Sequence, residues 1–308
     1  MAVGVAFAVL VFLLGASVGS FLNVVIYRLP QGISLVRPSS HCPGCKTLIK
    51  PWHNIPVFGW LIVRGRCTTC DTSLSLRYPL VELAVGLLAL AIFHDFAGGL
   101  IDPEVLIHDD FILDVLTPFV LYLVFVGGLV AITFIDLDHF IIPNEISLPA
   151  IPLGIIASVA AGHVMDLSWQ DALVGAAAGG GFLLAISMGY GALTGREGIG
   201  GGDVKLLAAL GAWLGWQAIP AILLLSSLTG IAFALLLRRA FAVETLPPDP
   251  MASASEHAET AAEATGAPKS FGQLAIPFGP FLCLAAIEYL LFRRELQALM
   301  TEYLTLSS

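Results

Sequence analysis

Two acidic residues stand where polar loops join long apolar segments. Asp203 closes the glycine-rich run 196–203 and precedes the apolar segment 204–217, and Asp136 ends another apolar segment seven residues before Pro143. A carboxylate at a membrane edge is costly to desolvate and is usually kept for ion handling, proton transfer or catalysis. Two carboxylates that converge can share one proton, so that one acts as a base on water and the other as an acid. Such a pair predicts the chemistry of an aspartic peptidase.

Residues around the two acids could support this site. Gly200 and Gly202 carry no side chains, which would let an extended peptide backbone approach Asp203. Lys205 could position the site or balance its charge, and an ordinary cytoplasmic flank is an equally good explanation of it. Asp138 lies near the first acid and could tune the pair.

Four of the five cysteines form two CxxC pairs in the polar segment 29–77. Cys42 pairs with Cys45 and Cys67 with Cys70, and 21 residues separate the two pairs. Each short turn brings two thiolates to one face, and this arrangement predicts a tetrahedral zinc site of the structural kind, because four sulfurs leave no open position. Two disulfides or redox pairs are the alternative, which a cytoplasmic location disfavours.

The elements that must position these groups are helices in a membrane. The chain has 308 residues, of which 57% are hydrophobic and 12% charged, and its mean hydropathy is +0.88. A span needs about 20 apolar residues, and we predict an all-α polytopic membrane protein with about eight transmembrane helices. The windows are 4–26, 78–97, 113–135, 141–162, 172–194, 204–217, 218–237 and 274–292.

Basic residues predict the orientation. Seven of the 14 Lys and Arg residues lie between Arg28 and Arg77, and the acidic segments 98–112 and 163–171 contain none. Positively charged loops stay on the cytoplasmic side, so both termini are predicted to lie outside, although the basic residues 293–294 argue against this for the C-terminus. The loops predicted to be cytoplasmic are 27–77, 136–140, 195–203 and 238–273.

The organisation follows from this topology. We expect a first transmembrane helix over 1–28, a cytoplasmic zinc-ribbon-like loop over 29–77 and a transmembrane catalytic region over 78–308, with a disordered cytoplasmic insert at 243–272. Small residues at 15–20 and the buried Asn23 predict close packing of the first helix on a neighbour.

Other roles remain open for single residues and for the whole chain. Glu82 is explained as well by the dipole at a helix start as by a function. A proton- or cation-coupled transporter could use the same acids, but they lie at one face instead of the bilayer midplane, and no inverted repeat is visible. A zinc-ribbon scaffold without chemistry would leave the acids unexplained.

The sequence resembles the type IV prepilin peptidases, which are GxGD-type intramembrane aspartic peptidases, over nearly its whole length. The matching segments, in family order, are 19–30 (GSFLNVVIYRLP), 40–45 (SHCPGC), 52–56 (WHNIP), 64–70 (RGRCTTC), 77–82 (RYPLVE), 135–139 (IDLDH) with 143–144 (PN), 197–205 (EGIGGGDVK) and 276–280 (IPFGP).

The resemblance implies an enzyme that removes the short basic leader of type IV prepilins or type II secretion pseudopilins by cleaving after glycine, with Asp136 and Asp203 as its catalytic acids. It implies a multi-pass protein of the bacterial inner membrane with its active site at the cytoplasmic face. Relatives with this cysteine-bearing loop also N-methylate the new N-terminus with S-adenosylmethionine. We expect the bilayer and pilin substrates as partners, with no nucleic acid and no obligate protein partner.

Overall fold

Helices make up the regular structure of this chain. The computed structural model describes residues 2–98, 110–195, 200–244 and 276–307, so that the predicted insert 243–272 falls outside it apart from residues 243–244. Within these ranges isolated β-bridges occur but no strand. The long helices are α1 (Ala2–Arg28), α3 (Arg77–Ala97), α4 (Thr117–His139), α5 (Asn144–Met165), α6 (Trp169–Thr194), α7 (Gly201–Leu214), α8 (Ala218–Glu244) and α10 (Gly279–Ser307). The short elements are η1 (Leu29–Gln31), η2 (Pro51–Asn54), α2 (Phe58–Ile62) and the π-helical turn η4 (Phe111–Leu116).

Six helices of the described ranges are long and apolar enough to cross a membrane: α1, α3, α4 with the preceding η4, α5, α6 and α8. The prediction of a multi-pass, all-helical protein is therefore confirmed. The other two predicted windows correspond to α7 and α10. With 14 residues, α7 reaches only about 21 Å, short of the roughly 30 Å of hydrocarbon.

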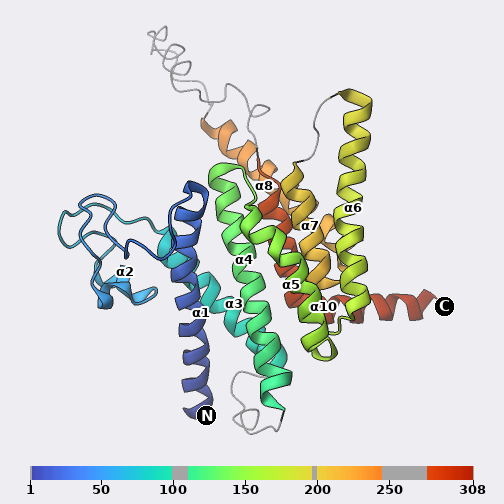
Figure 1. Ribbon diagram of the computed structural model, residues 1–308, viewed down its shortest axis with the longest axis horizontal. Coiled ribbons are helices and arrows are strands. Elements are labelled where there is room, and N and C mark those ends of the chain that lie inside the picture. Colours follow the sequence, from blue (N-terminus) through green and yellow to red (C-terminus); the bar gives the residue numbers. More distant parts are fainter. Residues whose placement is uncertain (1, 99–109, 196–199, 245–275, 308) are drawn as a thin grey trace.

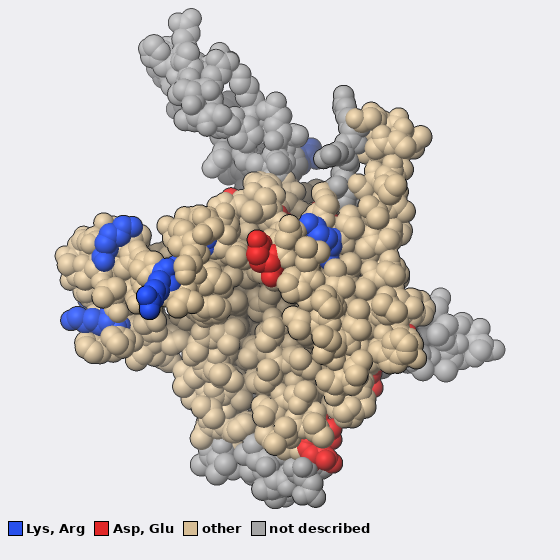
Figure 2. Space-filling model, in the orientation of Figure 1, with Lys and Arg blue, Asp and Glu red and all other residues tan. Residues whose placement is uncertain are grey.

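The helix ends that were predicted to share one side lie at one end of the bundle. In Figure 1, α4, α6 and α8 finish at the upper end, where α5, α7 and α10 begin, and the cysteine-bearing segment projects from the same half beside α1. On the face drawn in Figure 2, the visible Lys and Arg side chains lie in this upper half, over the cysteine-bearing segment and near the helix ends, while acids occupy the lower end as well as the upper.

Close packing of α1 on α3 depends on small residues, as the sequence predicts. A side chain at Gly19 would place its Cβ 2.8 Å from the Cα of Glu82. Asn23 donates from Nδ2 to the carbonyl oxygen of Tyr78, at 3.1 Å. Glycine thus lets two apolar helices touch, and one amide bonds across the contact.

Helices α6 and α7 meet in the same way but more closely. Gly175 on α6 and Gly211 on α7 face each other, and a Cβ on either would collide with the carbonyl group of the other. Gly154 of α5 packs on the indole of Trp213, whose Nε1 donates to the carbonyl oxygen of Ala150 at 2.8 Å. These contacts hold the short α7 between two longer helices.

Arg293 is an internal residue. Its side chain is 7% exposed and donates to the carbonyl oxygen of Met165 at 2.9 Å and to the Asp95 carboxylate at 3.3 Å. The positive-inside rule concerns charges in the loops that flank a membrane span. Because the Arg293 guanidinium is paired inside the bundle, it is not such a charge and does not argue against a C-terminus on the outer side.

Candidate functional site

Asp136 lies in the last turn of α4 and is 5% exposed. Phe140 ends the helix in the left-handed region, with φ of 56°, and its amide donates to the Asp136 carbonyl oxygen at 2.9 Å. Gly279, the first residue of α10, faces the Asp136 carboxylate so closely that a Cβ there would lie 2.5 Å from Oδ2. The carboxylate is therefore held between the end of one helix and the backbone of another.

Asp203 lies in the first turn of α7. Its amide donates to the Gly200 carbonyl oxygen at 3.1 Å, and a Cβ on Gly200 would lie 3.4 Å from Asp203 Oδ2. Gly202 packs on Ile142, where an added Cβ would lie 3.0 Å from Ile142 Cβ. A side chain at Gly200 would touch the acid itself, and one at Gly202 would meet the segment that links α4 to α5; the approach of a substrate backbone at these glycines stays a prediction.

Both acids line one cavity of about 520 Å³ at the upper end of the bundle. The structure thus brings Asp136 and Asp203 together, as the topology predicts. The cavity combines three segments that are far apart in sequence: residues 136–145 at the end of α4 and the start of α5, residues 200–205 at the start of α7, and residues 277–278 before α10. Its other lining residues are Phe140, Ile141, Ile142, Pro143, Asn144, Glu145, Gly200, Gly202, Lys205, Pro277 and Phe278.

Lys205 lines the same cavity and links two helices. Its Nζ donates to Oδ1 of Asn144, at 2.5 Å, at the first position of α5. This bond fixes the start of α7 to the start of α5, two residues from Asp203. The side chain of Lys205 is therefore held by a partner at the cavity, and its role in positioning the site stays a prediction.

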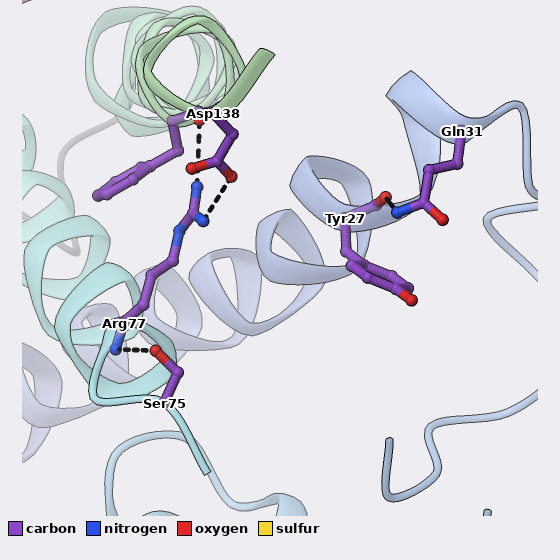
Figure 3. Close-up of polar contacts among 6 residues, drawn as sticks. Tyr27, Gln31, Ser75, Arg77 and Asp138 are labelled. Carbon is purple, nitrogen blue, oxygen red and sulfur yellow. Dashed lines mark hydrogen bonds and ion pairs between the residues drawn. The ribbon is translucent and has the colours of Figure 1, made fainter. Parts of the chain in front are cut away.

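Asp138 lies outside this cavity and bonds to Arg77 instead (Figure 3). Arg77 Nη1 donates to Asp138 Oδ2 at 2.6 Å, its Nη2 donates to the carbonyl oxygen of Phe134 at 3.1 Å, and its guanidinium stacks 4.7 Å from the Phe134 ring. The Arg77 amide donates to Ser75 Oγ at 3.2 Å. Asp138 therefore ties the start of α3, where the cysteine-bearing segment ends, to the end of α4.

The four predicted metal ligands form one cluster. The Sγ atoms of Cys42, Cys45, Cys67 and Cys70 all lie within 4.8 Å of one another. The Cys42–Cys70 and Cys45–Cys67 separations are 3.7 and 3.8 Å, too long for disulfides, and a tetrahedral zinc with Zn–S bonds of about 2.3 Å requires sulfurs about 3.8 Å apart. The donor set and its spacing fit zinc.

The two cysteine turns share one geometry. The Cys42 amide donates to Thr47 and the Cys67 amide to Thr72, each to the carbonyl oxygen at 2.9 Å. An antiparallel bridge flanks each turn, between His41 and Leu48 in the first and between Arg66 and Ser73 in the second. The hydroxyl of Thr72, 3.1 Å from Cys70 Sγ, lowers the pKa of that thiol to about 6. A thiolate at neutral pH is the form that binds metal.

Three residues of the site were not predicted from the sequence as site residues. Gly279 belongs to the matched segment 276–280 and Arg77 begins the matched segment 77–82, but the sequence assigned a role to neither residue. Ile142 carried none, because an isoleucine among apolar residues is indistinguishable from ordinary packing.

Comparison with known proteins identifies the family. The sequence profile described as the bacterial peptidase A24 N-terminal domain matches residues 13–96, and that of the type IV leader peptidase family matches residues 123–235. A relative from Aeromonas hydrophila, named prepilin leader peptidase/N-methyltransferase, is 41% identical over 72% of this chain and 78% of its own length. The chain belongs to the type IV leader peptidase family.

Further leader peptidases match over more of the chain. Relatives with the same name from Stutzerimonas stutzeri and Pseudomonas aeruginosa are each 34% identical, over 95% and 91% of this chain and 93% and 88% of their own. No solved structure matches. These comparisons give no support to the transporter alternative.

Proposed function

We propose that this chain is a prepilin peptidase that removes the short basic leader of type IV prepilins or type II secretion pseudopilins by cleaving after a glycine. The observation that carries the proposal is the convergence of Asp136 and Asp203 on one cavity at the end of a helical bundle. The relatives' names, all prepilin leader peptidase/N-methyltransferase, support this substrate class.

The two carboxyl groups share one proton. The ionised one takes a proton from a water, which attacks the scissile carbonyl carbon, and the protonated one donates to the carbonyl oxygen; the proton then passes to the leaving amine. Gly200 has no side chain beside Asp203 and would let an extended substrate backbone approach the acid, Gly202 lets α7 pack on Ile142, and Lys205 would hold the α7 start in place. Asp138 acts as a positioning residue through Arg77.

The location we propose is the bacterial inner membrane, with the active site at its cytoplasmic face. The six candidate spans support a multi-pass protein, and the basic residues of the upper half in Figure 2 follow the positive-inside rule. The domains we propose remain residues 1–28, 29–77 and 78–308.

A second activity, N-methylation of the new N-terminus, is proposed from the relatives' names. S-adenosylmethionine would supply the methyl group. A cavity of about 630 Å³ beside the cysteine cluster has the size and mixed lining of a small-molecule site. Trp60, Tyr78 and Lys46 are among the residues of this lining that could contact such a donor. Zinc on the four cysteines would be structural.

Cleavage of a prepilin by purified variants tests the peptidase. Asp136→Asn and Asp203→Asn should each abolish cleavage while membrane insertion and thermal stability persist, because only the ionisable carboxyl is lost. Asp110→Asn, an exposed residue before η4, is the matched control and should cleave normally. Normal cleavage by either active-site variant would refute the proposal.

A further inference from the structure

The carboxylate of Glu82 faces a different cavity from the two catalytic acids. Glu82 is 8% exposed and lines the 630 Å³ cavity between α1, α3 and the cysteine-bearing segment. Among the described residues that line this cavity it is the only acid, and none of them lines the peptidase cavity. A second buried carboxylate thus stands in a separate chamber, at the membrane edge.

This cavity extends from the cysteine turns to the membrane-spanning part of α1. It is lined on α1 from Ser17 to Arg28, a distance of roughly 16 Å along the helix axis at 1.5 Å per residue. Glu82 lies on the α3 side, where Gly19 brings α1 into close contact. A ligand in this cavity can therefore have one end beside the cysteine cluster and an apolar body along α1.

The contact that holds Glu82 is a strained turn. Its Oε2 accepts the Val57 amide at 2.6 Å, and Val57 has φ of 64° and ψ of −55°. The Phe58 amide donates to the Pro56 carbonyl oxygen at 2.7 Å, which makes this a γ-turn of the rare, strained kind. Strain of this kind costs on the order of 1–3 kcal/mol and is concentrated at functional sites.

Arg28, the basic residue of α1, does not neutralise the Glu82 carboxylate. Arg28 is buried, and its guanidinium donates to the carbonyl oxygens of Ser34, at 2.9 Å, and Pro38, at 2.7 Å. Lys46, Lys50 and Arg66 also line the cavity, but none of the ion pairs found among the described residues joins a cation to Glu82. An acid inside a membrane protein usually pairs with a cation or marks a substrate pathway, so a cationic group is the ligand that this carboxylate itself would attract.

The shape and charge of the cavity select among cations. A hard metal ion needs several oxygen ligands, whereas this cavity has one carboxylate. An ammonium group at the head of an apolar helix suits both the single carboxylate and the surface of α1, and the proposed peptidase creates that group at each cleavage.

We propose that Glu82 binds the N-terminal ammonium of the cleaved pilin in this cavity and accepts its proton for methylation. The inference rests on the proposed function. Once the proton has passed to the carboxylate, the amine lone pair forms the new N–C bond as the S–C bond of the donor breaks and its electron pair returns to sulfur. The N-methylated product is a secondary ammonium that keeps the other two protons, and the carboxyl proton leaves to water.

Peptide binding by the purified, zinc-loaded full chain in detergent tests this site. The probes are two fluorescent peptides of mature pilin sequence, one with a free N-terminal phenylalanine amine and one acetylated. Wild type should bind the free-amine peptide about tenfold more tightly, as expected of a charge-assisted hydrogen bond. Glu82→Gln, which can still accept the Val57 amide, should lose this preference, and Glu82→Asp should keep it.

Three measurements, of peptide binding, prepilin cleavage and methylation, distinguish the possible outcomes. Cleavage of prepilin by Glu82→Gln should equal that of wild type, which shows that the variant is folded, while its methylation should fall by at least about tenfold. Equal wild-type binding of the two peptides, or a preference kept by Glu82→Gln, would overturn the inference and leave peptidase and methylation standing. A Glu82-dependent preference without methylation by wild type would instead refute the proposed methylation and retain an amine-binding site.

Discussion

The backbone of Gly279 forms a wall against the Asp136 carboxylate, and a single added carbon at Gly279 tests this contact. A methyl group at Gly279 would lie 2.5 Å from Asp136 Oδ2, whereas ordinary contact begins at 3.4 Å, so that in Gly279→Ala the carboxylate must retreat by about the 0.9 Å difference. A misplacement of about 1 Å can reduce the rate about 100-fold, which corresponds to ~2.7 kcal/mol in the activation barrier. We therefore expect kcat for prepilin cleavage to fall about 100-fold.

The assay is the initial rate of prepilin cleavage by purified enzyme in detergent, with the melting temperature measured in parallel. Gly189→Ala on α6 is the control, since nothing lies within 4 Å of an added Cβ there, and its rate should equal that of wild type. A wild-type kcat for Gly279→Ala, with a wild-type melting temperature, would refute the placement of Asp136 as a catalytic acid held by this wall.

Three further predictions concern the supports of the site. Cys42→Ser should lower the bound zinc well below one equivalent and lower the melting temperature, because metal binding contributes directly to folding; an unchanged zinc content by metal analysis would contradict the cluster. Asp138→Asn should lower the free energy of unfolding by no more than about 1 kcal/mol, since the ion pair with Arg77 is partly exposed, but it should slow prepilin cleavage. The double variant Arg77→Asp with Asp138→Arg exchanges the two charges and should restore part of the cleavage rate. No recovery would count against the ion pair as the link between α3 and α4. Gly211→Val should destabilise the chain by about 1–3 kcal/mol in thermal unfolding by forcing α7 away from α6, and a neutral result would exclude the close contact.

Local patterns in the sequence predicted the helices and the cysteine cluster well. Windows of apolar residues specify spans because the bilayer fixes their length, and a CxxC pair specifies its own turn, as the matching bonds of Cys42 and Cys67 show. The two acids were predicted because a charged residue beside an apolar run is conspicuous. Their convergence followed only from the topology of the loops.

Contacts between distant segments could not be predicted in this way. Arg77 and Asp138 are 61 positions apart, and neither residue type specifies its partner. The start of α7 was also placed too late, at 204 instead of Gly201, because glycine disfavours helix and the packing of Gly202 on Ile142 outweighs that preference. The sequence left the role of Glu82 open, because its contact with the Val57 turn is a tertiary contact that no local pattern specifies.

Helix α10 has a consequence for biogenesis. It follows every other described helix in the chain, yet its first residue forms the wall at Asp136 and its Arg293 joins Asp95 of α3 to Met165 of α5. Domains fold largely from the N-terminus during synthesis, so the earlier helices leave the ribosome without this wall and without this cation. A nascent or truncated chain without α10 therefore lacks both the Gly279 backbone that contacts the Asp136 carboxylate and the cation that bonds to Asp95.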